Sequence, residues 1–462
     1  MPSEREIVQG IVSGALNDWH ARLRTSEKGK LLQCWQNVYT FLGFHPAWSG
    51  VLALDTFAQR VVKRKPPPFE RAAVGPWTPD DDAELGLWLA AQDGEDRFVV
   101  ISKQTLIDGI SASAMRHRFH PVREYLEACK PSAKPLIDCW TTRFLGARAS
   151  RYTAAVGRYF LMNMVTRILE PGCIMRSVPV LEAAQERGKS TALHALAQPW
   201  FSDSHFELAS KDAFEVIQGV WLYEISEMEQ FSKAETTRVK QFISSREDNY
   251  RPPYERRAQR MPRQVCFGGT TNDRQYLRDW SGNTRFWPLR CEEEGEIRIE
   301  ELAQARDGLF GEAFALCRAR ARRHPTREES AAHFEPEQEA RRPEHLWMPM
   351  VAKWLNDPAL VVRRNEVMVT EVLYEGLGIK PDRMTATMQR DVGLILTALG
   401  WEQARPGGHN GYRPRVYRRP AAVGGADAVG APAIHVPSII APGDIDPSIG
   451  REPGEDDELL PL

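Results

Sequence analysis

The sequence predicts an α/β protein that has a central sheet flanked by helices, a mixed domain before it and a winged-helix-like domain after it. Residues 150–292 alternate helical segments with short apolar runs, which is the pattern of a sheet covered by helices. Within this region, Gly188-Lys189-Ser190-Thr191 stands between an apolar run and a good helix former. Near the C-terminus, a helical segment leads into two β-prone stretches around a glycine-rich turn, an order that favours a winged helix.

The chain of 462 residues is long enough for several domains. Changes in composition divide it into an N-terminal domain that is α/β or mostly helical (1–147), the domain with the central sheet (148–325), a charged linker (326–345), the winged-helix-like domain (346–420) and an acidic tail (421–462). The tail holds eight carboxylates against Arg451 alone and has little apolar periodicity, so we expect it to be disordered. Because the net charge of the whole chain is −2, the rest of the chain is mildly basic.

Composition argues against a membrane protein and against a disulfide or zinc scaffold. Hydrophobic residues make up 42% and charged residues 26% of the chain. No apolar run approaches the roughly eighteen residues that span a bilayer, and the N-terminus lacks the basic and apolar regions of a secretory signal. The seven cysteines form no C-x-x-C and no zinc spacing. We therefore expect a cytoplasmic protein with reduced cysteines.

A phosphate-binding loop of the form G-x-x-x-x-G-K-[ST] is predicted at residues 183–190, although Ala183 takes the place of the first glycine. The run 177–182 before it is apolar and β-prone, and residues 190–197 favour a helix. In such a loop, backbone N–H groups hold the phosphates of ATP, the lysine neutralises them and the first hydroxyl binds Mg²⁺. We therefore predict that ATP contacts Gly188, Lys189, Ser190 and Thr191, and that Ser190 binds Mg²⁺.

A second buried strand is predicted at Val220–Tyr223, and it runs into Glu224 and then Glu227. A carboxylate at the end of an apolar strand can hold the Mg²⁺ of a nucleotide, and a second one nearby can polarise the attacking water. We assign Glu224 to the metal and Glu227 to the water. The alternative is that both are surface glutamates at the end of a strand.

A third strand is predicted at 264–272, and it ends in Asn272. In an ATPase of this type, a polar residue at that end of the strand lies beside the γ-phosphate and can orient the water. The loop, the acidic strand end and the polar strand end follow one another in the expected order, which argues against a chance occurrence of the loop motif.

Several stretches resemble, in their order, the virulence-associated protein E family: "PVLEAAQERGKSTALHAL", "WFSD", "SKDAFEVIQGVWLYEISEME", "VKQFISSREDNYRPPYERR", "PRQVCFGGTTN" and "YLRDWSGNTRFWPL". These are phage and mobile-element replication proteins with a P-loop ATPase similar to superfamily 3 helicases and AAA+ proteins. The resemblance covers about residues 150–292 and, more weakly, the N-terminal region through "FHPVREYL" and "RFLGA".

The resemblance implies a role for each matching residue. Lys189 and Ser190 fall on the phosphate loop, Glu224 and Glu227 on the acidic motif, and Asn272 on the sensor. Arg285 falls on an arginine that reaches the nucleotide of the neighbouring subunit, so the resemblance implies a ring, expected to be hexameric.

A basic segment lies between the acidic strand and the sensor strand, where superfamily 3 helicases have a hairpin that projects into a central channel. Its candidate DNA contacts combine positive charge with an aromatic ring, which suits a single strand, and they are Arg251, Tyr254, Arg256 and Arg257. The alternative is a solvated basic loop.

The winged-helix-like domain is predicted from the helix that Met388, Val392, Ile395, Leu396 and Leu399 form by spacing, ended by Gly400. The basic hairpin after this helix would point arginines at DNA phosphates, and we choose Arg413 and Arg415 as candidates. The alternative is a small helical cap with a solvated arginine face.

The chain also departs from the family pattern. Ala183 and Glu186 replace glycines, Thr284 replaces one of two adjacent arginines, and Ile174 stands where many members have lysine. A carboxylate in this loop repels phosphate unless Glu186 points to solvent or pairs with Arg187. These departures leave the capacity for hydrolysis open.

The leading hypothesis is a DNA-stimulated ATPase, a ring helicase in phage or mobile-element replication, that uses ATP and Mg²⁺ and moves single-stranded DNA through its channel, with duplex DNA at the C-terminal domain. The alternative is a catalytically impaired P-loop scaffold or DNA-binding assembly protein. A transcription factor built on the winged helix explains too little of the chain. The N-terminal region is short for a primase and shows no carboxylate motif of that kind, so we do not predict primer synthesis.

Overall fold

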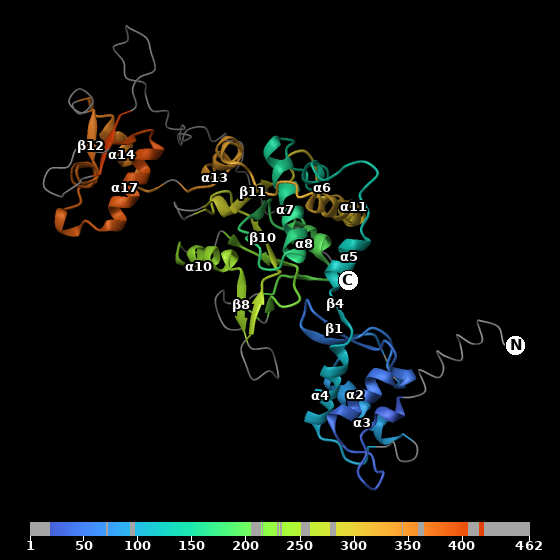
Figure 1. The fold of residues 1–462 in the computed structure, drawn as a ribbon. Helices are drawn as coiled ribbons and strands as arrows, with labels where there is room; N and C mark the ends of the chain where they lie inside the picture. Colours follow the sequence, from blue (N-terminus) through green and yellow to red (C-terminus); the bar gives the residue numbers. More distant parts are fainter. Residues whose placement is uncertain are drawn as a thin grey trace, which may run out of the picture. The chain divides into compact units, whose positions relative to one another are not determined.

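The computed structural model describes residues 19–419 except 71–72, 93–97, 205–213, 215, 229–230, 232, 251–258, 278–282, 344, 359–364 and 405–414. The chain divides into two compact units, residues 1–343 and 344–462, which Figure 1 shows in one ribbon. The predicted acidic tail lies outside the described residues. Across the described part, no helix is long and apolar enough to cross a membrane.

The first part of unit 1 joins a small sheet to a set of helices. Its strands run in the order β3-β2-β1-β4, with bounds β1 (Leu52–Asp55), β2 (Arg60–Lys63), β3 (Gly75–Pro76) and β4 (Arg118–Phe119). The helices are α2 (Trp35–Phe44), α3 (Pro79–Ala90) and α4 (Lys103–Ala114). Phe41, Trp48 and Phe98 are buried in the core that these elements share. Two helices, α5 (Pro121–Ala128) and α6 (Trp140–Leu145), lead into the central domain.

The central domain is built on a five-stranded sheet in the order β11-β5-β10-β7-β6, in which every neighbouring pair is parallel. Its strands are β5 (Val178–Glu182), β6 (Phe201–Ser202), β7 (Leu222–Ile225), β10 (Cys266–Thr271) and β11 (Phe286–Arg290). The residues of β5, β7 and β10 are all buried, as expected for parallel strands that are covered on both faces. The predicted α/β architecture with a flanked sheet is therefore confirmed.

Alternate residues of these strands pack into two separate cores. Leu181 and Leu222 pack with α7 (Arg151–Leu169), α8 (Lys189–Ala197) and α11 (Ile299–Arg318). Val180 and Tyr223 pack on the other face with α10 (Lys233–Ser244). Figure 1 shows α7 and α8 on one side of β10 and α10 on the other.

The observed strands are close to the predicted ones, but the acidic strand starts and ends later than expected. It was predicted at Val220–Tyr223 and is observed at Leu222–Ile225, because its pairing with β10 continues through Ile225. Glu224 therefore lies inside the strand and not beyond it, and its side chain is only 2% exposed.

The segment after α11 differs from the charged linker that composition predicts. It forms α12 (Arg327–Glu329), the π-helical turn η6 (Ser330–Phe334) and α13 (Glu335–Glu339). Phe334 is buried, and Gln338 Nε2 donates to the carbonyl of Phe286 at 2.9 Å. These two residues are four apart in a segment that is otherwise strongly charged, so composition hides the face that packs on β11.

Unit 2 contains a three-stranded antiparallel sheet in the order β12-β14-β13. Its elements are α14 (Met348–Leu355), β12 (Glu366–Met368), α16 (Val369–Glu371), the π-helical turn η7 (Val372–Gly376), the 3-10 turn η8 (Pro381–Arg383), α17 (Ala386–Ala398), β13 (Glu402–Ala404) and β14 (Val416–Arg418). The predicted helix is confirmed as α17, which ends before Gly400 with φ 81°. Arg415 is exposed just before β14, and Arg413 lies outside the described residues. The winged-helix assignment stays a prediction.

Candidate functional site

The carboxyl ends of β5, β10 and β7 bring the predicted site residues to one edge of the sheet. Strand β10 lies between the other two, and its Thr271 is level with Glu182 of β5. In parallel strands the carboxyl ends point the same way, so the loops that follow them share this edge. The phosphate loop, Asn272 and Glu227 follow β5, β10 and β7 and line one cleft of about 740 Å³.

The backbone of the phosphate loop explains its glycine and tests its two departures. Gly188 has φ 82°, and a Cβ there would lie 2.9 Å from Ile299 Cδ1, so both conformation and space require glycine. Glu186 is also left-handed, with φ 61°, which costs a non-glycine residue about 1–2 kcal/mol. Ala183 lies outside the left-handed region, so alanine carries no such cost there.

Lys189 lies at the centre of the loop and is 7% exposed. Its ammonium donates to the carbonyls of Ala183 at 2.8 Å and Ala184 at 2.7 Å, and to Asn272 Oδ1 at 2.9 Å. A buried ammonium needs such acceptors. The predicted loop lysine and the predicted sensor are therefore in direct contact.

Ser190 and Glu224, the two predicted ligands of Mg²⁺, are also in contact. Ser190 Oγ donates to Glu224 Oε1 at 2.7 Å, and Thr270 Oγ1 donates to the same oxygen at 2.6 Å. The second carboxylate oxygen, Oε2, is buried and accepts no hydrogen bond from the described residues. A buried oxygen without a partner is costly, so this geometry fits a cation beside Oε2 and Ser190.

The described residues contain no cluster of three or more His, Cys, Asp or Glu side chains that would hold a metal alone. A cation at Glu224 would therefore need other oxygen ligands, and Mg²⁺ commonly takes them from water and from substrate phosphates. This agrees with a site that binds a metal together with a nucleotide.

Glu227 follows β7 and lines the same cleft. It is exposed, and its φ of 51° is left-handed. A strained non-glycine backbone is typical of functional sites, and this conformation places the carboxylate at the mouth of the cleft while Glu224 stays buried.

The opposite wall of the cleft comes from a segment that sequence patterns did not indicate. It is formed by Glu292, Glu296, Ile297 and Ile299. Arg187 pairs with Glu292, with Nε and Oε2 3.8 Å apart, and Glu186 is exposed. Of the two conditions under which the loop tolerates Glu186, exposure to solvent is therefore met. Contacts across more than 100 residues leave no signal in local spacing, so only the structure reveals this wall.

Arg285, the predicted finger, is not brought to the phosphate loop of its own chain. It lies in the 3-10 turn η5 (Asn283–Arg285) directly before β11, at the opposite edge of the sheet. Its Nε donates to Ser244 Oγ at 3.0 Å. Burial lowers the pKa of Arg285, and the charge of Arg176 lowers this pKa further.

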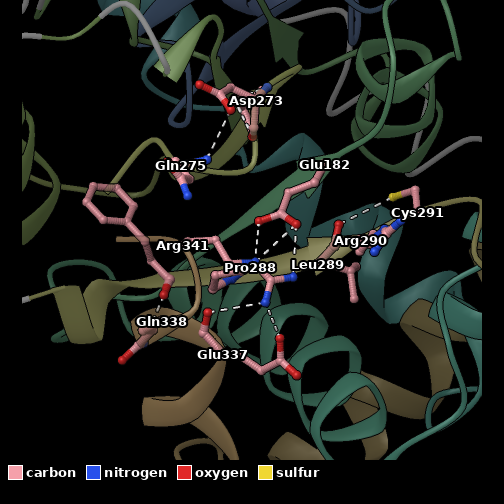
Figure 2. A network of polar contacts seen from close by, with 12 residues as sticks. Glu182, Asp273, Gln275, Pro288, Leu289, Arg290, Cys291, Glu337, Gln338 and Arg341 are labelled. Atoms are coloured by element: carbon pink, nitrogen blue, oxygen red, sulfur yellow. Dashed lines mark hydrogen bonds and ion pairs between the residues drawn. The ribbon is translucent and has the colours of Figure 1, made fainter. Parts of the chain in front are cut away.

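A buried ion pair lies directly behind the phosphate loop (Figure 2). Arg341 donates through Nε to Glu182 Oε1 at 2.9 Å and through Nη2 to Oε2 at 3.0 Å. The backbone carbonyl of Arg341 accepts from Leu277 N at 3.2 Å, so Arg341 also contacts the segment that follows Asn272. Burial raises the pKa of the Glu182 carboxyl, and Arg341 opposes this shift. Sequence analysis missed this pair because its members are 159 residues apart.

The predicted channel residues Arg251, Tyr254, Arg256 and Arg257 lie outside the described residues. The segments on either side of them are β8 (Glu247–Tyr250) and β9 (Gln259–Pro262), which pair as antiparallel strands. The DNA contacts of the tip between these strands stay a prediction.

Comparison with known proteins gives one family and one group of structures. Residues 126–343 match the model of the virulence-associated protein E-like domain. A structure of the A form of the NrS-1 C-terminal region is similar at 10% identity with a TM-score of 0.44, over 84% of this chain and 100% of that one. An apo structure of its residues 305–718 gives 12% identity and a TM-score of 0.43, over 82% and 98%. No curated protein matches the chain.

Proposed function

Residues 126–343 of this chain are a virulence-associated protein E-like domain, and on that basis we propose that the protein is a DNA-stimulated ATPase with a P-loop core like those of superfamily 3 helicases and AAA+ proteins. Its substrate is ATP, and it acts in the replication of a phage or another mobile element. The observation that carries the proposal is the contact of Lys189 with Asn272 and of Ser190 with Glu224 at one strand edge.

The phosphate chain of ATP is held by the loop and the start of α8. Backbone N–H groups at a helix N-terminus attract anions, and Gly188 is the N-cap of α8. Lys189 neutralises the phosphates. Its present acceptors are two loop carbonyls and Asn272, and the phosphate oxygens take over from some of them when ATP binds. Thr191 lines the same cleft.

Ser190 and Glu224 hold Mg²⁺ in this proposal, because Glu224 Oε2 is buried beside the loop without a partner among the described residues. When bound, Mg²⁺ supplies positive charge to the β- and γ-phosphate oxygens. Thr270 holds Oε1 at 2.6 Å, which fixes the orientation of the carboxylate.

Hydrolysis then needs a water molecule beside the γ-phosphate. Glu227 orients this water and accepts its proton, and Asn272 positions it. The water oxygen forms a bond to the γ-phosphorus while the bond to the bridging oxygen breaks, and that oxygen leaves with the electron pair as part of ADP. The products are ADP and inorganic phosphate.

The altered loop favours the second candidate function, a P-loop scaffold that does not hydrolyse ATP. Glu186 adds a negative charge and a strained backbone to the cleft. The retained side chains of Lys189, Ser190 and Glu224, which are hydrogen-bonded as the chemistry requires, oppose this candidate, since a decayed enzyme is expected to lose such groups.

A ring of subunits, hexameric by analogy with superfamily 3 helicases, completes the proposal. Arg285 lies at the edge opposite its own loop, so it can act only on the nucleotide of another copy. The hairpin tip with Arg251, Tyr254, Arg256 and Arg257 contacts single-stranded DNA, and unit 2 contacts duplex DNA through Arg413 and Arg415.

Steady-state ATP hydrolysis, with and without single-stranded DNA, tests the proposal. The native protein, Lys189→Ala and Glu227→Gln are compared, with the exposed Arg24→Ala as control. We expect turnover that rises with DNA and is lost in the first two variants only. A native protein without turnover, which gains it when Ala183 and Glu186 are both changed to glycine, would establish the scaffold instead.

A further inference from the structure

Two arginines lie side by side at the sheet edge opposite the phosphate loop. Arg285 directly precedes β11, and Arg176 lies two residues before the start of β5. These strands are neighbours, and their first residues, Phe286 and Val178, are paired. Paired strands lie about 4.8 Å apart, so the two arginines enter the sheet next to each other although 109 residues of sequence separate them.

The surroundings of this pair are short of negative charge. Arg176 is exposed, and within the described ranges no carboxylate forms an ion pair with it. Arg285 is held by the neutral hydroxyl of Ser244, and the charge of Arg176 is close enough to lower the pKa of Arg285. Two like charges repel each other when no anion lies near them, so this arrangement indicates an anionic ligand.

The phosphates bound to the same chain cannot be that ligand. The five residues of β5 lie between this edge and the phosphate loop, which is about 16 Å of strand and more than an arginine side chain spans. A head-to-tail assembly brings the loop edge of one copy against the opposite edge of the next. In such an assembly both arginines face the nucleotide of a second copy.

We propose that Arg176 acts together with Arg285 as a second cation on the γ-phosphate of ATP bound in a neighbouring copy of this chain. This inference rests on the proposed function. As the bond from the γ-phosphorus to the bridging oxygen breaks and the bond to water forms, negative charge shifts onto the leaving oxygen and the transferred group. Two guanidinium groups stabilise this charge better than one.

Arg176→Ala and Arg285→Ala test the proposal in the full chain, with the exposed Arg24→Ala as matched control. Because each loop still holds its own ATP, we expect the Kd for ATP to stay within about twofold while kcat falls at least about tenfold in both arginine variants. Arg176→Lys keeps the charge and should recover part of kcat. Equal kcat values for Arg176→Ala and Arg24→Ala, with Arg285→Ala impaired, would overturn this inference and leave the proposed function standing.

Mixed assemblies separate action on a neighbour from a structural role. Lys189→Ala has a defective loop and intact arginines, whereas Arg176→Ala has the reverse. In an equal mixture, about a quarter of the interfaces join an intact loop to an intact arginine pair, so turnover should recover to as much as about a quarter of the native value. A mixture no more active than its two components would overturn the inference.

Binding of DNA distinguishes the other source of phosphate. If Arg176→Ala weakens the binding of a single-stranded oligonucleotide and keeps native kcat at saturating DNA, the arginine contacts nucleic acid and the inference is wrong. If the native protein has no turnover under any of these conditions, the proposed function fails and this inference fails with it.

Discussion

Ser190 Oγ lies 2.7 Å from Glu224 Oε1, and this hydrogen bond links the first residues of α8 to the middle of β7. Thr270 donates to the same oxygen from β10, so three elements hold one carboxylate. The other oxygen stays buried without a partner among the described residues. Such a carboxylate is rigid and incompletely satisfied, which is the condition that a bound cation would relieve.

Glu224→Gln tests this interpretation with little change in shape. The glutamine oxygen can still accept from Ser190 and Thr270, but the amide nitrogen replaces Oε2 and cannot bind a cation. We expect the variant to fold and to lose at least about 100-fold in kcat, and ATP binding should no longer depend on Mg²⁺. Activity assays and calorimetry over a range of Mg²⁺ concentrations measure this. Thr270→Ser, which keeps the hydroxyl, is the control; native Mg²⁺ dependence in Glu224→Gln would exclude Glu224 as a metal ligand.

Glu186→Gly separates strain from charge in the phosphate loop. Glycine removes the cost of the left-handed backbone at φ 61°, although its greater freedom in the unfolded chain offsets part of the gain, so stability should rise by about 0.5–1 kcal/mol. Glu186→Gln removes only the charge. Both variants should bind ATP more tightly, and only the glycine variant should melt at a higher temperature. Unchanged ATP affinity in both would mean that the carboxylate does not act on the phosphates.

Gly188→Ala should abolish ATP binding because a Cβ at this position is strained at φ 82° and meets Ile299 at 2.9 Å. Gly400→Ala is a matched control, since Gly400 also has a left-handed φ, of 81°, but has open space around its missing Cβ. Each change should cost about 1–2 kcal/mol from strain, measured by urea unfolding, while only Gly188→Ala loses ATP binding. Loss of ATP binding in both variants would point to general destabilisation.

Arg341→Ala tests the buried pair behind the loop. Without its partner, the Glu182 carboxylate is left buried at 4% exposure, which should cost about 3–5 kcal/mol. Arg158→Ala removes a comparable pair with Asp138 whose side chains are 42% and 51% exposed, and it should cost at most about 1 kcal/mol. Denaturant unfolding measures both. Similar losses for the two variants would show that burial does not strengthen the role of Arg341.

Local pattern predicted much of the sheet and the centre of the site. Short apolar runs gave the buried strands, and the family resemblance over residues 150–292 is confirmed by the match at 126–343. The structure brings Lys189 to Asn272 and Ser190 to Glu224. Their proposed roles in catalysis stay predictions.

The missing parts depend on contacts between residues that are distant in sequence. Thr270 reaches Glu224 across 46 residues, and Arg341 reaches Glu182 across 159. Neither has a spacing that marks it, because strand order, which places β10 between β5 and β7, is a property of the assembled sheet. The segment 326–345 was predicted as a linker for a related reason: its charged residues conceal Phe334 and Gln338, which pack against the domain.

The central claim is that this altered loop is a working site for ATP with Mg²⁺, and titration calorimetry tests it most directly. ATP is titrated into the native protein and into Lys189→Ala, each with and without Mg²⁺. We predict that the native protein binds ATP, that Mg²⁺ tightens this binding, and that Lys189→Ala binds at least about tenfold more weakly. Absence of binding by the native protein, or equal affinity in the two proteins, would contradict the account.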